Sequence, residues 1–234
     1  MKFDAALSPS DISRLPERDL SHTTCVVFDV LRATSSMITA LANGAAEIHP
    51  AKTIEEARAL RTEMPDALLG GERHGERIEG FDLGNNPFEY AATAGRRIIS
   101  TTTNGTIALR ACERAGRVLV GALLNIAALR NELARTRPPE VLLVCAGTFE
   151  TFALEDAIAA GVLAAEFPDA ELTDAAVAVV ASAKRFATPL DGLLAARNGC
   201  ALIAKGWKKQ IEWCAEVSRF GVIGAMDGRI IRSL

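Results

Sequence analysis

The stretch VVFDVLRATSS, residues 26–36, marks a junction between a strand and a helix. Its first part is apolar and rich in β-branched residues, which favours a buried strand that ends at Asp29. Arg32 follows, and then residues 34–36 supply the small hydroxyl side chains with which helices often begin. The pattern predicts that a carboxylate, a guanidinium group and a helix N-terminus meet at one point.

The same order repeats along the chain, because apolar strand-like runs alternate with alanine-rich helical runs. The strand-like runs are 24–30, 46–50, 66–71, 96–103, 117–123 and 140–147, and the helical runs are 34–44, 53–65, 104–116, 125–136 and 153–167. Residues 173 to about 218 are mostly helical in pattern, and residues 220–234 have the pattern of a hairpin that turns at Asp227-Gly228. This alternation predicts an α/β fold with helices on both faces of a sheet.

Caps and turn residues sharpen these bounds. Thr34 or Ser35 is the expected N-cap of the first helix, with Asn43-Gly44 as its stop, and Thr53 with Glu56 forms a capping box. No linker-like segment interrupts the pattern. We therefore expect one compact unit over residues 1–234, within which two interlocked subdomains of about 1–120 and 121–234 remain an alternative.

Composition narrows the class of protein. The formal net charge is −3, with 26 basic and 29 acidic residues, so nothing favours a nucleic-acid or membrane-surface partner. The five cysteines are far apart and lack a CxxC pair, which is typical of reduced thiols in a cytoplasmic protein. The N-terminus lacks the apolar segment of a signal peptide, and the most apolar window, 175–183, is too short to span a bilayer.

Four of the predicted strands end in unusually polar segments. These are residues 29–36, 70–77, 100–106 and 145–150, the last followed by Glu155 and Asp156. Ligands in open α/β sheets bind outside the carboxyl ends of the strands. If these strands are neighbours, the four segments face one pocket.

Each segment supplies a different chemistry. The helix starts at Thr34, Ser35 and Ser36, and at Asn104, Gly105 and Thr106, are candidate anion sites. Asp29, Glu72, Glu155 and Asp156 carry the hard oxygen ligands that Mg²⁺ prefers. Arg32, Arg73 and Arg77 carry guanidinium groups suited to phosphate or carboxylate. Together these are the components of phosphoryl transfer or hydrolysis.

Each feature also has a purely structural explanation. Asp29 or the hydroxyl residues after it can simply cap a helix, and the pairs Glu72–Arg73 and Glu76–Arg77 can be solvated ion pairs. Thr101 to Thr103 can be the end of a strand, and Glu155 and Asp156 can face solvent. His74 is a site candidate by position alone, whereas His22 and His49 have no metal-ligand spacing. The DxDx[TV], GxxxxGK[ST], GxGxxG and CxxxxxR phosphate motifs are all absent.

Four stretches together resemble the 2-phosphosulfolactate phosphatase family. They are VVFDVLRATSSMITALANGA (26–45), GGERHGERIEGFDLGNNPFEY (70–90), STTTNGTIAL (100–109) and LLVCAGTFETFALEDAIAAGVL (142–163). The likeness runs from about residue 24 to 165 and extends more loosely to the DGRI near the end. The loop at 84–87 departs from the family's usual GNSP, because Asn86 replaces the serine.

The resemblance implies a Mg²⁺-dependent phosphatase of coenzyme M biosynthesis that converts (R)-2-phospho-3-sulfolactate to 3-sulfolactate and phosphate. It also implies a three-layer α/β/α fold and a homodimer. The loops would equally serve a related phosphorylated 2-hydroxy acid.

On this hypothesis Asp29 and one or more of the other three acids hold Mg²⁺. Arg32 and the N–H groups of residues 34–36 hold the phosphoryl oxygens. Arg73 and Arg77 hold the sulfonate or carboxylate, helped by residues 104–106. Cys145 and Gly147 join the substrate-binding candidates, and the attacking group is water, Asp29 or Cys145. The alternatives are a Mg²⁺-dependent lyase or isomerase of a phosphorylated carboxylate, and a non-enzymatic anion-binding protein.

Overall fold

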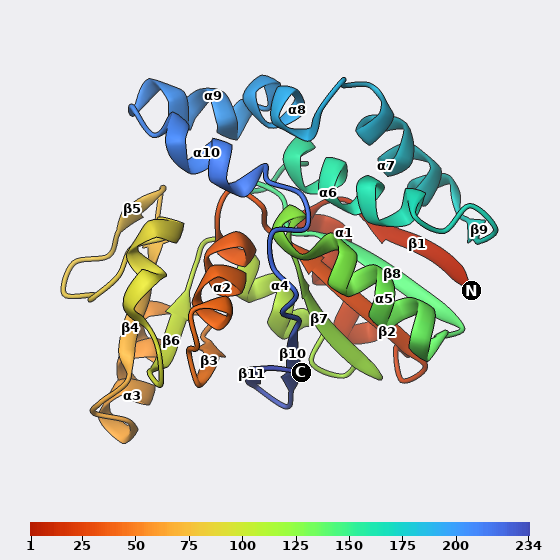
Figure 1. Cartoon of the computed structure of the whole chain (residues 1–234). Coiled ribbons are helices and arrows are strands. Elements are labelled where there is room, and N and C mark those ends of the chain that lie inside the picture. The colour runs from red at the N-terminus through yellow and green to blue at the C-terminus, as the bar shows by residue number, and fades with distance from the viewer.

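The computed structural model describes all of residues 1–234 and contains one large mixed sheet with helices packed around it, so the expected α/β fold is confirmed (Figure 1). The strand order across the sheet is β5 (Glu76–Arg77), β4 (Leu68–Arg73), β6 (Arg97–Thr101), β3 (Glu47–Pro50), β11 (Ile230–Ser233), β10 (Gly224–Asp227), β7 (Arg117–Gly121), β2 (Thr23–Phe28), β8 (Glu140–Cys145), β1 (Lys2–Ala6) and β9 (Glu171–Leu172).

The α-helices are α1 (Pro9–Ser13), α2 (Ala33–Ala42), α3 (Ile54–Glu63), α4 (Gly105–Ala111), α5 (Ile126–Thr136), α6 (Leu154–Ala165), α7 (Asp174–Lys184), α8 (Pro189–Ala195), α9 (Arg197–Ala204) and α10 (Lys208–Cys214). Three short 3₁₀ helices are η1 (Leu15–Glu17), η2 (Pro87–Ala92) and η3 (Leu123–Asn125). Helices α7 to α10 run across the top of the molecule, above α6 (Figure 1). None of the helices has the length and apolar character needed to cross a lipid bilayer.

Two parallel groups of strands flank the C-terminal hairpin. Strand β10 is antiparallel to β7, and β11 is antiparallel to β3, so the pairing reverses the strand direction between the two groups. Each step along a sheet adds about 20–25° of twist, so the five steps from β2 to β6 turn the strands by roughly 100–125°. Because this twist offsets much of the reversal, the carboxyl ends of both groups meet at one place.

Alternate residues of the central strands face opposite sides of the sheet. Val26 and Phe28 of β2 belong to a buried cluster with residues of α5 and α6, whereas Cys25 and Val27 belong to a second cluster with residues of α1, α2 and α4. A third, smaller cluster joins α3 to β4 and β6. Helices therefore cover both faces, which buries the strands and leaves their ends as the accessible part of the sheet.

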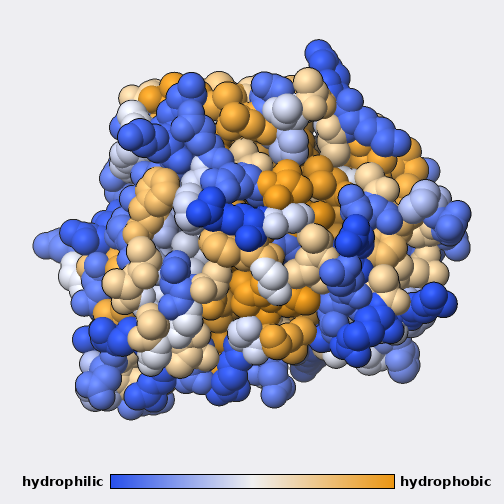
Figure 2. All heavy atoms as spheres, in the orientation of Figure 1, coloured by the Kyte–Doolittle hydropathy of each residue, from blue (hydrophilic) through white to orange (hydrophobic).

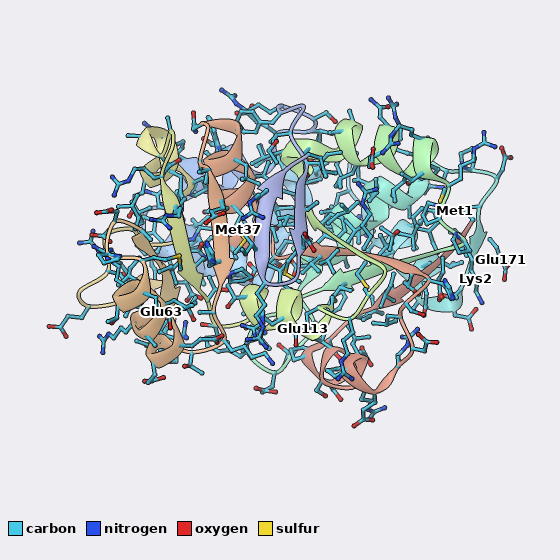
Figure 3. All side chains as sticks on the ribbon, turned by 90° about the horizontal axis from the view of Figure 1, so that it is seen from below. Met1, Lys2, Met37, Glu63, Glu113 and Glu171 are labelled. Carbon is cyan, nitrogen blue, oxygen red and sulfur yellow. The ribbon has the colours of Figure 1, made fainter.

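Several local predictions are confirmed. Helix α2 ends at Asn43-Gly44, where Gly44 has a φ of +82°, and the Thr53 side chain accepts a hydrogen bond from the Glu56 N–H at the start of α3. The second bond of the predicted capping box is absent, because the Glu56 carboxylate accepts from the Lys52 N–H and not from the Thr53 N–H. The predicted C-terminal hairpin is present with its turn after Asp227, and it lies in the middle of the sheet (Figure 3). Pro87 begins the 3₁₀ helix η2, whose N-cap is Asn86.

Three strands, β1, β5 and β9, were not predicted from the sequence. In β1 only Phe3 and Ala6 are buried, so no continuous apolar run marks this strand. It pairs in parallel with β8 on one side and with β9 on the other, where Lys2 and Glu171 lie 3.9 Å apart at one end of the sheet (Figure 3). Its place depends on these distant partners and not on local pattern.

Candidate active site

A cavity of about 200 Å³ lies where the carboxyl ends of β2, β4, β6 and β8 meet. The polar segments after these four strands therefore face one cavity, as the sequence predicts. Among the candidates from the sequence, those that line it are Asp29, Arg32, Glu72, His74, Asn104, Gly147, Glu155 and Asp156.

Asp29 lies between the N-termini of two helices. Its Oδ1 accepts a hydrogen bond from the Ala33 N–H at 3.1 Å, and Gly105 of α4 approaches so closely that a Cβ there would lie 2.6 Å from Oδ2. Burial, followed by the charges of Glu72 and Glu155, raises the pKa of Asp29 to about 7, against the opposing effect of the Ala33 and Gly105 N–H groups. Asp29 thus caps α2 and also faces the cavity.

Glu72 joins the end of β4 to the end of β6. Its Oε2 accepts from the Gly75 N–H at 2.7 Å, and its Oε1 accepts from the Thr103 N–H at 2.8 Å. The hydroxyl of Thr103, which also lines the cavity, is buried and has no hydrogen-bond partner. A buried hydroxyl without a partner is costly. This oxygen is therefore free for a ligand in the cavity.

Glu155 and Asp156 are both buried, with 2% and 1% of their surface exposed, so they do not face solvent. Asp156 accepts from the Val30 N–H at 2.8 Å and from the Gly147 N–H at 3.0 Å, which ties the segment after β2 to the segment after β8. Burial raises the pKa of both carboxyl groups. The first turn of α6 therefore brings two acids into the cavity wall.

Arg32 is held from three directions. Its Nη1 donates to Gln210 Oε1 of α10, its Nη2 donates to the Gly75 carbonyl at 2.8 Å, and its guanidinium carbon lies 4.8 Å from the centre of the Trp207 ring. Only 4% of its surface is exposed, and desolvation lowers its pKa. Arg32 is thus a fixed cation beside the buried acids.

The hydroxyl residues after Arg32 do not line the cavity. Thr34 Oγ1 hydrogen-bonds the Asp29 main chain, Ser35 Oγ donates to the Val30 carbonyl, and Ser36 Oγ donates to the Asn85 carbonyl. The expectation that Thr34 or Ser35 is the N-cap is wrong, because Arg32 occupies that position and α2 begins at Ala33.

The backbone N–H groups of Thr34 and Ser36 also have hydrogen-bond partners within the protein. The Thr34 N–H donates to the Asp29 carbonyl and the Ser36 N–H donates to the Arg32 carbonyl. Thr106 of α4 is used in the same way, because its hydroxyl bonds the main chain of Thr102. These residues hold the loops in place and leave the anion contacts to other groups.

Arg73, Arg77 and Cys145 also lie outside the cavity lining. Strand β4 continues through Arg73, so Glu72 and Arg73 point to opposite faces, and Arg73 donates to Thr101 Oγ1 at 3.0 Å. Arg77 points to the Asp82 carbonyl at 3.5 Å. Cys145 is fully buried at the end of β8, and burial raises the pKa of its thiol.

Further residues complete the cavity wall. His74 lines it, in keeping with its position in the sequence, and the centre of its ring lies 5.8 Å from that of Phe149, which also lines the cavity. Asn198 and Lys205 of the α9 region also line it. Neither has a motif in its neighbourhood that could have identified it, because both belong to an unremarkable helical stretch.

The side chains that line the cavity can be compared with the ligands that a metal ion needs. No group of three or more histidine, cysteine, aspartate or glutamate side chains is arranged to hold a metal ion. Mg²⁺ needs fewer protein ligands, since it is usually bound by one or two carboxylates together with water and substrate phosphate. The mutual repulsion among Asp29, Glu72 and Glu155 and the unpaired Thr103 hydroxyl fit such an ion.

Comparison with known proteins places this chain in a family. The model of the 2-phosphosulpholactate phosphatase family matches residues 10–228. A probable 2-phosphosulfolactate phosphatase of Deinococcus radiodurans is 40% identical over 82% of this chain and 83% of its own length. A probable 2-phosphosulfolactate phosphatase of Carboxydothermus hydrogenoformans is 36% identical over 99% and 97%, and one of Clostridium acetobutylicum is 37% identical over 92% and 93%. This chain therefore belongs to the 2-phosphosulpholactate phosphatase family.

Proposed function

We propose that this chain is a Mg²⁺-dependent phosphoric monoester hydrolase that converts (R)-2-phospho-3-sulfolactate, or a related phosphorylated 2-hydroxy acid, to the hydroxy acid and phosphate. One observation carries the proposal. Four carboxylates, supplied by β4, by α6 and by the segment after β2, line the same cavity as the buried guanidinium group of Arg32. The names of the relatives support the same substrate.

Charge balance supports the metal. The cavity wall contains four acids and two cations, Arg32 and Lys205, and an anionic substrate adds further negative charge. Asp29, with one of the other acids that line the cavity, would hold Mg²⁺. Glu72 and Asp156 each also accept hydrogen bonds from two backbone N–H groups. When bound, the ion would screen the negative charge of the phosphate and polarise its oxygens.

The chain's own groups would orient the substrate. Arg32 still has N–H donors besides the two that anchor it, and these would bind phosphoryl oxygens. The Thr103 hydroxyl would donate to the same group. The attacking group is either water, with a buried carboxylate as its base, or Asp29 itself. Cys145 has no access to the cavity and is excluded from our proposal.

The test is release of inorganic phosphate from 2-phospho-3-sulfolactate by the purified protein. We expect turnover with Mg²⁺, loss of turnover with EDTA, and recovery when Mg²⁺ is restored. Asp29→Asn should lower kcat by at least about 10³-fold with little change in thermal stability, since a neutral amide replaces the central carboxylate. Asp169→Asn, at an exposed position, is the matched control. Near-normal kcat in Asp29→Asn would exclude the proposed role of Asp29.

We also propose a homodimer that acts in the cytoplasm. The face in Figure 2 has an apolar area near its centre, among hydrophilic side chains, and a dimer interface would cover such an area. All five cysteines are free, which suits a reducing compartment. Light scattering coupled to size-exclusion chromatography tests the dimer, and a mass of one chain, about 24.9 kDa, would contradict it.

A further inference from the structure

Arg32 and Lys205 lie together on one wall of the cavity. Both stack on Trp207, with the Arg32 guanidinium carbon 4.8 Å and the Lys205 Nζ 4.9 Å from the ring centre. A Cβ at Gly75 would lie 3.5 Å from Lys205 Nζ and 3.9 Å from Arg32 Nη2. The turn between β4 and β5 therefore has both cationic groups beside it.

The two cations differ in how firmly they are held. Arg32 is buried and anchored by Gln210 and the Gly75 carbonyl. Lys205 Nζ contacts Glu76 Oε1 at 2.5 Å and the His74 carbonyl at 3.4 Å, and the side chains of this ion pair are 36% and 61% exposed. Exposed ion pairs contribute little stability, so Lys205 can exchange Glu76 for another anion at low cost.

The charges of the proposed substrate require a second cation. A phosphorylated 2-hydroxy acid carries a carboxylate on the carbon that bears the phosphate, and a sulfonate adds a third anion. Arg73 and Arg77, the residues suggested by the sequence for these groups, lie outside the cavity lining. Adjacent anions are best matched by adjacent cations, and the cavity has one such pair, Arg32 and Lys205.

We propose that Lys205 is a specificity-determining residue, which binds the carboxylate or sulfonate of the substrate while Arg32 binds its phosphate. The inference rests on the proposed function and deepens it, because it restricts the substrates to phosphate monoesters that carry a second anionic group. Without substrate, Glu76 holds the ammonium group at the edge of the cavity. With substrate, the ammonium group turns from Glu76 to the second anion.

Steady-state kinetics of Lys205→Met tests this role with two substrates. 2-Phospholactate has the second anion and phenyl phosphate lacks it. For 2-phospholactate we expect KM to rise roughly 10- to 100-fold, the loss expected for one charge-assisted hydrogen bond, with kcat within about twofold of the wild type. For phenyl phosphate, which has no second anion, KM should rise by no more than a few-fold, because only the general attraction of one exposed charge is lost.

Two further variants serve as controls. Lys205→Arg keeps the charge and should restore most of the affinity for 2-phospholactate. Lys208→Met removes a lysine that pairs with Glu212 on the surface of α10 and should change neither substrate's KM. Thermal unfolding of all variants checks that the helices around Trp207 are intact.

Two results would overturn the inference. Either an unchanged KM for 2-phospholactate in Lys205→Met, or an equal rise in KM for both substrates, would show that Lys205 does not select the second anion.

Calorimetric binding of 3-sulfolactate and of inorganic phosphate separates this test from the proposed function. Even if the wild type hydrolyses none of the esters, Lys205→Met should weaken the binding of 3-sulfolactate at least about tenfold and the binding of phosphate much less. Equal weakening of both ligands, or of neither, would contradict the role of Lys205. If these binding results are obtained but no ester is hydrolysed, only the proposed hydrolysis is contradicted, and the role of Lys205 stands.

Discussion

At the scale of single residues, the position of Asp29 depends on the absence of a side chain at Gly105. The backbone of Gly105 has an ordinary negative φ, so the glycine is needed for space and not for conformation. A Cβ there would lie 2.6 Å from Asp29 Oδ2 and 2.8 Å from the Ala33 Cβ. The close approach lets the first turn of α4 support the carboxylate.

Gly105→Ala should therefore lower kcat/KM by about 10²-fold, because a small displacement of a reacting group costs about that much. Stability should fall by no more than about 1–3 kcal/mol, the usual cost of overpacking. Gly221→Ala is the matched control, because a Cβ there would meet no atom within 4 Å. Kinetics and urea unfolding of both variants provide the measurement. Wild-type kcat/KM in Gly105→Ala would mean that Asp29 needs no such support.

Hydroxyl residues illustrate what a local pattern leaves open. Thr34, Ser35 and Ser36 have the composition of a helix start, and a helix does start there. Their hydroxyls bond the main chain of Asp29, Val30 and Asn85 instead of a ligand. Which partner a hydroxyl takes depends on where the chain folds back, and sequence spacing carries no information on that.

At the scale of elements, α6 is buried on more sides than its pattern indicates. A helix on the outside of an α/β fold exposes one face, so the sequence pattern alone is compatible with solvent exposure of Glu155 and Asp156. Helices α7 and α8 pack onto α6 from outside, so its polar first turn is enclosed between them and the sheet (Figure 1). This second helical layer converts two ordinary acids into buried ones.

Helix α5 is attached to β7 by an ion cluster far from the cavity. Glu132 contacts Arg117 at 2.5 Å and Arg135 at 2.7 Å, and only 8% of its surface is exposed. The hydrogen bond from Arg135, followed by that from Arg117, lowers the pKa of Glu132. A carboxyl group with a lowered pKa stabilises the fold above its unfolded pKa, near 4.3, and this contribution is lost as pH falls through the folded value.

Glu132→Gln should therefore reduce the free energy of unfolding by about 1–2 kcal/mol at pH 7. The difference from wild type should shrink steadily below about pH 4, where the wild-type carboxyl also becomes neutral. Urea unfolding at pH 3 to 8 measures it, with Glu166→Gln as a control for a more exposed pair with Arg130. A deficit that persists unchanged at pH 3 would point to packing instead of charge.

At the scale of the whole molecule, the C-terminal hairpin joins the two parallel groups of strands. Strand β11 contacts β3 through Ile231 and Ile48, and β10 pairs with β7. Both isoleucines are fully buried. The hairpin of β10 and β11 therefore completes a sheet whose other strands come from earlier parts of the sequence. It sets the relative position of the strand ends that form the cavity.

Ile231→Ala should destabilise the protein by about 2–5 kcal/mol through the cavity it leaves. If residues 1–234 form one cooperative unit, loss of activity and loss of helical signal should coincide in urea for both the variant and the wild type. Ile203→Ala, at a position with 40% exposure, should be nearly neutral. Two separate transitions would instead favour the two-subdomain alternative, with a division near residue 120.

Sequence alone determined the elements whose signals are local. The apolar run before Asp29, the Asn43-Gly44 stop, the Thr53 cap and the hairpin turn after Asp227 each depend on near neighbours, and each is where the pattern predicts it. The polar ends of four strands also identified the region of the cavity, because strand ends in such folds are where ligands bind.

Tertiary structure alone decided which side chains share that cavity. It added β1 through its partners β8 and β9, turned Arg73 away by extending β4, and buried Glu155 under a further helical layer. It also brought Lys205 beside Arg32, although 173 positions separate them. Such contacts arise from sheet twist and helix packing between residues far apart in the sequence. The spacing of residues within one segment therefore does not predict them.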